Sequence, residues 1–315
     1  MPPVQRHSTL HPHVRALVLE MKEADPTLAV RAKASLVIRD FRAVFGGEPP
    51  FNLDALASFR GLHSSADAPR HSADSEIVPE SDGRVVLRIN RDRPATRQRF
   101  SIGHELGHTL FKDFHLKVQC RKAFDRDWAD PNDQIESLCD IAASEFLFPS
   151  PWFHDRVQDI ELGAQTLSVL ASDYQASREA MLRRLIEIRM EPLAIVFFSW
   201  KLKPVELRQV RRDRQQPRMF DAAVHPDPKL RVDYGITNDA FDAECTSHIP
   251  KDKSVPSEGP IFEASVTQTP RDGCLWLDLG SVSGEFSVCA LPIYTPDESA
   301  GPGGIASVAA LLMPS

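Results

Sequence analysis

The sequence predicts an α+β protein in which a mostly helical domain with a small β-hairpin precedes a second domain of mixed α and β structure. Apolar residues recur at helical spacing from Thr27 to Phe45 and again over residues 133–148, which indicates helices that bury one face. From residue 193 onward, short apolar runs alternate with Pro and Gly, which is typical of strands and turns. This change of pattern places a domain boundary near Met190.

The composition is that of a globular protein, since 42% of the 315 residues are hydrophobic and 26% are charged. No apolar run reaches the roughly 18 residues of a membrane helix, and the N-terminus lacks the apolar core of a signal peptide. We therefore expect a cytoplasmic protein with no membrane partner. The five cysteines have no CxxC spacing and are expected to be free thiols. A net charge of -7 opposes indiscriminate binding to nucleic acid.

The first predicted elements follow one another closely. The helix that starts at Thr27 ends at Gly46-Gly47, and a short helix begins at Asn52, a residue type that caps helices well. A polar loop is expected over residues 63–75. Strand-like runs then flank Asp82-Gly83, a dipeptide that favours tight turns, so we expect a β-hairpin over residues 76–90.

The next predicted helix, Thr96 to Phe111, carries the string His104-Glu105-Leu106-Gly107-His108. Residues four apart share one face of a helix, so both imidazoles can reach the same metal ion. Imidazole nitrogens suit Zn²⁺, and a catalytic zinc normally has three protein ligands and one open position. Glu105 lies beside that position as a candidate general base. The string therefore predicts a zincin-like peptidase domain that needs a third ligand.

Glu136 and Asp140, four apart on the following helix, are the candidates for completing the site. In zincins of the His-His-Glu type, a glutamate on a following helix is the third ligand, and an acidic residue one turn later holds a histidine. Glu136 fits the ligand role and Asp140 the supporting role, with Asp140 as the reserve ligand. The alternative is a solvated acidic face, which the apolar neighbours of these residues disfavour.

At these positions the chain resembles the ImmA/IrrE family of metallopeptidases, and it looks most like the CapP-like antiphage branch. The resemblance covers roughly residues 30–190 and is carried by Arg97-Gln98-Arg99-Phe100, the HELGH string, Glu136, and Phe146-Leu147-Phe148-Pro149. The chain departs from the family at Leu138-Cys139-Asp140, where Glu-Ala-Asn is frequent. The resemblance implies a regulatory zinc endopeptidase that cleaves helix-turn-helix repressors in response to DNA damage or phage infection.

The same resemblance implies a GAF-like sensory domain in the C-terminal part, and the Gly/Pro-rich end of the chain is expected to be flexible. The predicted ranges are an N-terminal arm (1–26), a peptidase domain (27–190) that includes a helix-turn-helix-like helical pair (162–189), a sensory α/β domain (191–295) and a flexible tail (296–315). The helical pair could also be an ordinary helical hairpin.

Cys120 follows His108 by twelve residues and lies between the two ligand helices. A loop there could fold back over the metal, so Cys120 is a candidate inhibitory fourth ligand, and a small buried thiol is the equally weighted alternative. The partner that stabilises the oxyanion stays open among His115, His154 and Tyr174.

Single-stranded DNA is a candidate activator through six basic residues, namely Arg183, Arg184, Arg208, Arg211, Arg212 and Arg214, although such clusters are usually solvated faces. The main competing hypothesis is a DNA-binding regulator that keeps zinc only for structure. A third is a stress sensor whose C-terminal domain binds a small molecule.

Overall fold

The computed structural model describes residues 10–70, 73–112, 114, 119–120, 128, 130–215, 226–245, 248–280, 282–295 and 305–314. The chain forms two compact units. The N-terminal unit comprises Met1–Arg156 with Ser172–Ser177, and the C-terminal unit comprises Val157–Ala171 with Arg178–Ser315. The helical pair predicted at residues 162–189 therefore belongs mostly to the C-terminal unit. The predicted boundary near Met190 instead placed this pair in the peptidase domain.

The helices of the N-terminal unit follow the sequence pattern. They are α1 (Pro12–Met21), α2 (Pro26–Phe45), α3 (Leu53–Phe59), α4 (Ala95–His108), α5 (Pro131–Leu147) and α6 (Trp152–Gln158). The Asp25 side chain caps α2 by accepting hydrogen bonds from backbone N–H groups, and Asn52 caps α3 by accepting one from the Ala55 N–H at 3.0 Å. The predicted helices at 27–45, 52–57, 96–111 and 133–148 are confirmed, with ends that differ by a few residues.

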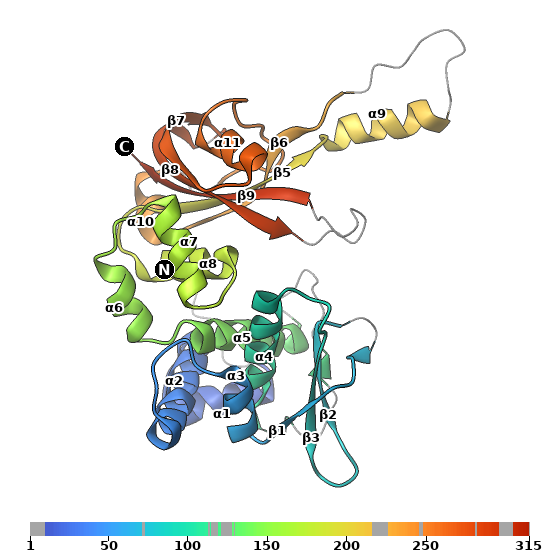
Figure 1. Ribbon diagram of the computed structural model, residues 1–315, viewed down its shortest axis with the longest axis vertical. Helices are drawn as coiled ribbons and strands as arrows, with labels where there is room; N and C mark the ends of the chain where they lie inside the picture. Colours follow the sequence, from blue (N-terminus) through green and yellow to red (C-terminus); the bar gives the residue numbers. More distant parts are fainter. Residues whose placement is uncertain are drawn as a thin grey trace. The chain divides into compact units, whose positions relative to one another are not determined.

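A four-stranded sheet with the order β1-β3-β2-β4 lies beside these helices in the described part of the unit (Figure 1). Its strands are β1 (Leu62–Ser65), β2 (Ser75–Pro79), β3 (Val85–Ile89) and β4 (Gln119–Cys120). β2 and β3 pair antiparallel across the turn at Gly83, whose φ is 87°, so the hairpin prediction is confirmed. β1 pairs parallel with β3 in a stretch expected to be a loop, since its sequence Leu-His-Ser-Ser has little strand character.

One buried carboxylate ties α2 to α5. Glu145 is 1% exposed, and it accepts hydrogen bonds from the Ser35 hydroxyl at 3.1 Å and the Ser150 N–H at 2.8 Å. Arg31 of α2 adds an ion pair at 3.5 Å. A buried carboxylate is stable only with such partners, so these contacts fix the position of α5.

The C-terminal unit is built on a five-stranded antiparallel sheet with the order β6-β5-β9-β8-β7 in its described residues (Figure 1). The strands are β5 (Ala194–Lys201), β6 (Lys229–Thr237), β7 (Arg271–Asp278), β8 (Ser283–Thr295) and β9 (Ile305–Pro314). The flexible tail expected over 296–315 is wrong for residues 305–314, because β9 is the central strand. Its apolar run, Val308 to Leu312, is fully buried, whereas the Gly/Pro-rich residues that precede it favour a flexible segment.

Helices cover this sheet, so both faces of β5 are buried. They are α7 (Ala164–Asp173), α8 (Arg178–Ile188), α10 (Asp239–Glu244) and α11 (Pro260–Thr267). Ala194, Val196 and Phe198 share a core with residues of α10 and α11, while Phe197 has the opposite orientation and lies under Arg183 of α8. The unit is therefore mixed α and β, as expected.

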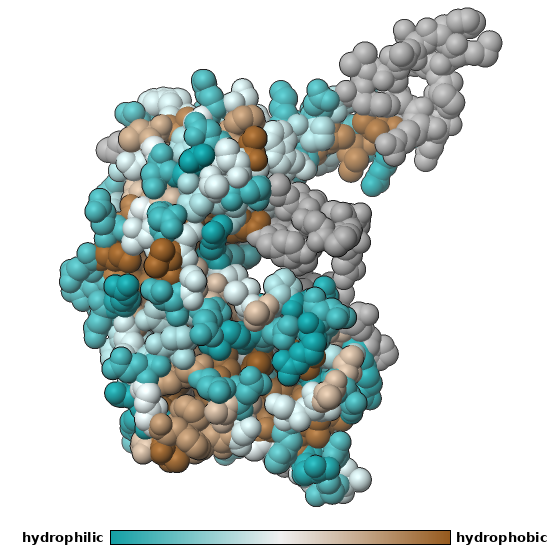
Figure 2. Space-filling view, viewed as in Figure 1, coloured by the Kyte–Doolittle hydropathy of each residue, from teal (hydrophilic) through white to brown (hydrophobic). Residues whose placement is uncertain are grey.

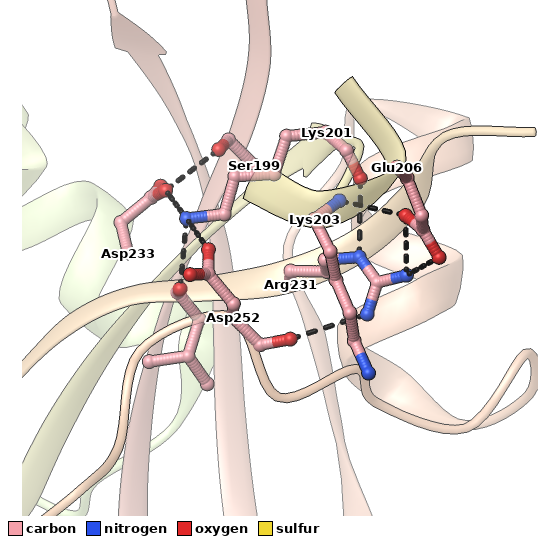
Figure 3. A network of polar contacts seen from close by, with 8 residues as sticks. Ser199, Lys201, Lys203, Glu206, Arg231, Asp233 and Asp252 are labelled. Carbon is pink, nitrogen blue, oxygen red and sulfur yellow. Dashed lines mark hydrogen bonds and ion pairs between the residues drawn. The ribbon is translucent and has the colours of Figure 1, made fainter. Parts of the chain in front are cut away.

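The remaining helix, α9 (Pro204–Gln215), extends from the end of β5 and is anchored by a polar network (Figure 3). Arg231 of β6 is 2% exposed, and its side chain pairs with both carboxylate oxygens of Glu206 at 3.2 and 3.3 Å. Arg231 also donates to the backbone carbonyls of Lys201 and Asp252, and the Lys201 ammonium pairs with Asp233 at 2.7 Å. The network fixes the first turn of α9 to β5 and β6.

Apolar side chains are exposed near the ends of α2 and α3, where Figure 2 shows a hydrophobic area. Val44, Phe45 and Phe59 are 66%, 61% and 39% exposed. Among the described residues, the structure contains no helix that is long and apolar enough to span a membrane.

The central position of β9 can be tested by truncating a core side chain. Replacing the fully buried Leu312 by Ala should lower the free energy of unfolding of the C-terminal unit by about 2–5 kcal/mol, because it leaves a cavity in the core that Leu312 shares with Phe241 and Ile261. Met313→Ala, on the other face of the same strand and only partly buried, is the matched control and should cost less. Equal and negligible losses in denaturant unfolding would contradict a core role for β9.

Candidate metal centre

The site begins with the contact between α4 and α5, which pack closely in the N-terminal unit (Figure 1). A Cβ atom added at Gly107 would lie 2.8 Å from the Cys139 Cα and 3.0 Å from the Cys139 carbonyl oxygen. One at Gly103 would lie 3.2 Å from the Ala143 Cα. The two helices can approach this closely only because Gly occupies these positions on α4 and small residues face them from α5.

This contact brings together donors from both helices. The His104 and His108 side chains are 0% and 2% exposed, and their Nε2 atoms lie 3.2 and 3.4 Å from the two carboxylate oxygens of Glu136. Nitrogen and oxygen donors on one tetrahedral zinc ion are about 3.4 Å apart, given metal–ligand distances of about 2.0–2.2 Å. The two imidazoles and Glu136 therefore have the separations and the chemistry that a bound divalent metal requires.

Asp140 holds the first imidazole from the other side. Its Oδ1 lies 2.8 Å from His104 Nδ1, which leaves Nε2 facing Glu136. Burial lowers the pKa of His104, but the interactions with Asp140 and Glu136 outweigh burial and raise the pKa to about 9. Binding of a metal ion at Nε2 therefore competes with protonation of this imidazole.

Glu105 is fully buried and is held by a residue that the sequence did not reveal. The Ser75 hydroxyl, at the start of β2, donates to Glu105 Oε1 at 2.5 Å, and both residues are 0% exposed. The neighbouring Asp74 pairs with Arg93 at 2.8 Å and with Arg97 at 2.6 Å. These ion pairs fix the start of β2 against α4, so the carboxylate of Glu105 has a defined position.

Cys139 also belongs to this group of side chains. One donor atom from each of His104, His108 and Cys139 can be chosen so that all three lie within 4.8 Å of one another, and all three residues are buried. The side chain of Cys120, the cysteine singled out from the sequence, lies outside the described residues, and only the backbone pairing of Cys120 in β4 with Glu76 of β2 is described. Cys139, Cys245, Cys274 and Cys289 are free thiols, as expected.

The arginines singled out from the sequence occupy different environments. Arg183 lies over the rings of Phe197 and Tyr234, and Arg184 is 4% exposed and pairs with Glu187 at 3.1 Å. Both side chains are therefore used in packing within the C-terminal unit. Arg208, Arg211 and Arg212 are exposed on α9, and the side chain of Arg214 lies outside the described residues.

The structure describes two of the three oxyanion candidates, Tyr174 and His154. Tyr174 packs against the rings of Phe148 and Phe153, and burial raises the pKa of its hydroxyl group. His154 is half exposed on α6, and His115 lies outside the described residues. The role stays open.

The supporting role of Asp140 can be measured as metal affinity. Replacing it by Ala frees the His104 ring, so the affinity for zinc should fall by about 10–100-fold. Competition with a chromophoric chelator measures this change. Asp155→Ala, which removes an exposed carboxylate on α6, should leave the affinity unchanged. Wild-type affinity in Asp140→Ala would contradict the role.

The comparisons with known proteins agree with this site. Residues 62–186 match the family model Peptidase_M78, described as the IrrE N-terminal-like domain. This range contains α4 and α5, and therefore every residue of the metal centre.

Two curated relatives are named radiation response metalloprotease IrrE. The protein from Deinococcus radiodurans is 26% identical over 171 residues, which are 54% of this chain and 46% of that protein. The one from Deinococcus deserti is 27% identical over 171 residues, 53% of this chain and 58% of that protein. The chain thus spans about half the length of the curated relatives it matches.

A solved structure, titled transcriptional regulator from Mycobacterium tuberculosis, aligns with 96% of this chain and 79% of its own length. The TM-score is 0.53 and the identity 13%, which shows a shared fold. Together, the family match and the two curated relatives show that residues 62–186 form an IrrE N-terminal-like domain, similar to that of the ImmA/IrrE metallopeptidases.

Proposed function

We propose that this chain is a zinc-dependent endopeptidase. The observation that carries the proposal is the convergence of His104 Nε2 and His108 Nε2 on the carboxylate of Glu136, with Glu105 buried beside them. Two imidazoles and one carboxylate form a donor set that leaves one position of a tetrahedral ion open, which is the arrangement of catalytic zinc sites.

When bound, zinc supplies Lewis-acid chemistry, polarising a peptide carbonyl and making water more acidic. Glu105 then has the role of a general base: its carboxylate takes a proton from the attacking water and passes it to the leaving amine. The Ser75 hydroxyl holds Oε1 of Glu105, so the other oxygen, Oε2, is the one assigned to proton transfer. Asp140 keeps His104 oriented throughout.

The competing function is a DNA-binding regulator with a structural zinc. It does not explain why a buried carboxylate, Glu105, lies beside the imidazoles. A structural site uses four protein ligands and needs no base. A fully buried carboxylate is also costly, and here it is held by a dedicated hydroxyl beside the imidazoles. These features support catalysis.

The natural substrate and the regulation are part of the same proposal. We assign to this chain the cleavage of a helix-turn-helix transcriptional repressor in the cytoplasm, triggered by DNA damage or phage infection, as in the CapP-like branch. The names of the Deinococcus relatives, which refer to a radiation response, support a link to damaged DNA. Single-stranded DNA is the candidate activator, and the exposed Arg208, Arg211 and Arg212 of α9 offer a positive surface for its phosphates. The C-terminal unit has the role of a GAF-like sensory domain.

The peptidase is tested by Glu105→Gln, which keeps the shape of the side chain but removes the base. Cleavage of the helix-turn-helix protein encoded beside this gene should fall by at least ~10²-fold, because general base catalysis contributes about 10²–10⁴-fold. Bound zinc should stay unchanged. Cleavage by wild type that also depends on single-stranded DNA, and is lost on replacing the three exposed arginines of α9 by Ala, would support the activator. Equal cleavage by wild type and Glu105→Gln would contradict the proposal.

Ser75 is expected to position the base. Ser75→Ala removes a hydrogen bond to a charged group, so kcat should fall roughly 10–100-fold with KM and zinc content unchanged. Ser75→Thr keeps the hydroxyl and should recover most of the activity. An unchanged kcat in Ser75→Ala would show that Glu105 does not depend on this contact.

A further inference from the structure

The thiol of Cys139 lies at the metal centre although no role has been assigned to it. Its Sγ and one nitrogen from each of His104 and His108 fall within 4.8 Å of one another. Cys139 is 0% exposed, and it follows Glu136 by three residues on α5, which places both on the same side of the helix. Two side chains of α5 therefore point towards the two imidazoles of α4.

The backbone of Cys139 cannot move away from these imidazoles without separating the helices. It is the residue that a Cβ atom at Gly107 would meet, at 2.8 Å from its Cα and 3.0 Å from its carbonyl oxygen. Gly107 directly precedes His108 in α4. The contact that joins the helices thus also holds the thiol beside the histidines.

The distances suit coordination with a small adjustment. A sulfur and a nitrogen donor on one tetrahedral zinc ion are about 3.6 Å apart, given Zn–S of about 2.3 Å and Zn–N of about 2.0–2.1 Å. Sulfur–nitrogen separations within 4.8 Å need a shift of at most about 1.2 Å, which a change of side-chain torsion can supply. Thiolate sulfur is also a soft donor that zinc and cobalt accept readily, unlike magnesium or calcium.

We propose that Cys139 is a metal ligand in this site, so that His104, His108, Glu136 and Cys139 form a four-donor set. The inference rests on the proposed function, because it concerns the same metal ion. On coordination the thiol gives one proton to solvent and binds as a thiolate. Four protein donors fill the coordination positions of a tetrahedral ion, so the thiolate-bound form has no position for water. Hydrolysis takes place only in the form in which the Cys139 side chain has rotated its Sγ away from the metal.

Cobalt binding tests separately whether the site binds a metal ion and whether a sulfur atom is one of the ligands. The full-length chain is stripped of metal, kept reduced, and titrated with Co²⁺ alone while its absorption spectrum is recorded. Visible d–d bands report that cobalt is bound in a four-coordinate site, and a near-ultraviolet thiolate-to-cobalt charge-transfer band reports a sulfur ligand. Wild type should show both features.

The variants identify the sulfur. Cys139→Ala, which removes only Sγ from the helix contact, should keep the d–d bands and lose the charge-transfer band. Cys289→Ala, a second buried cysteine in the C-terminal unit, should keep both features. Cys120→Ala should also keep both.

Three results would overturn the inference. The first is a wild-type spectrum with d–d bands and no charge-transfer band. The second is a charge-transfer band that persists in Cys139→Ala or disappears in Cys120→Ala, since either places the ligand elsewhere. The third is the absence of any four-coordinate cobalt spectrum, which would overturn the proposed metal function together with the thiol ligand.

Discussion

The close contact between α4 and α5 is the constraint on which the metal centre depends. Neither helix carries a complete site, since α4 supplies two imidazoles and the base, while α5 supplies Glu136, Cys139 and Asp140. A side chain at Gly107 would overlap the backbone of α5, with only 2.8 Å between its Cβ and the Cys139 Cα. The absence of a side chain at this position, rather than any single hydrogen bond, sets the distance between the donors.

The contact between α4 and α5 also gathers carboxylates at the site, and a bound cation would balance their negative charge. The carboxylates of Glu105, Glu136 and Asp140 lie around two buried imidazoles, which concentrates negative charge at the site. Asp140 and Glu136 raise the pKa of His104 to about 9 despite its burial, so these carboxylates favour positive charge at the imidazole. A divalent ion at Nε2 would satisfy the same preference and balance more of the negative charge. The hydroxyl of Ser75 and the ion pairs of Asp74 complete the arrangement from β2.

Local patterns predicted much of the fold and of the site. The helical period revealed α2, α4 and α5. The spacing of His104 and His108, with the glutamate expected on the following helix of such zincins, predicted the residues that the structure brings together, His104, His108 and Glu136. Ser75 could not be predicted, because it meets Glu105 across 30 residues of sequence and belongs to no motif. Cys139 has no CxxC spacing, so only the packing of α5 shows where its thiol lies. β9 was missed because Gly- and Pro-rich residues precede it, and because β5, one of its two partners, lies far away in the sequence.

The most direct measurement is the metal content of Gly107→Ala compared with that of Gly103→Ala. Alanine favours a helix by about 1 kcal/mol over glycine, so propensity alone would strengthen α4 in both variants. The added Cβ at position 107 must displace α5. At position 103 the nearest atom is 3.2 Å from the added Cβ, so α5 has to move less. We expect Gly107→Ala to lose most of its zinc and Gly103→Ala to keep most of it. Wild-type zinc affinity in Gly107→Ala would contradict the claim that this contact sets the donors.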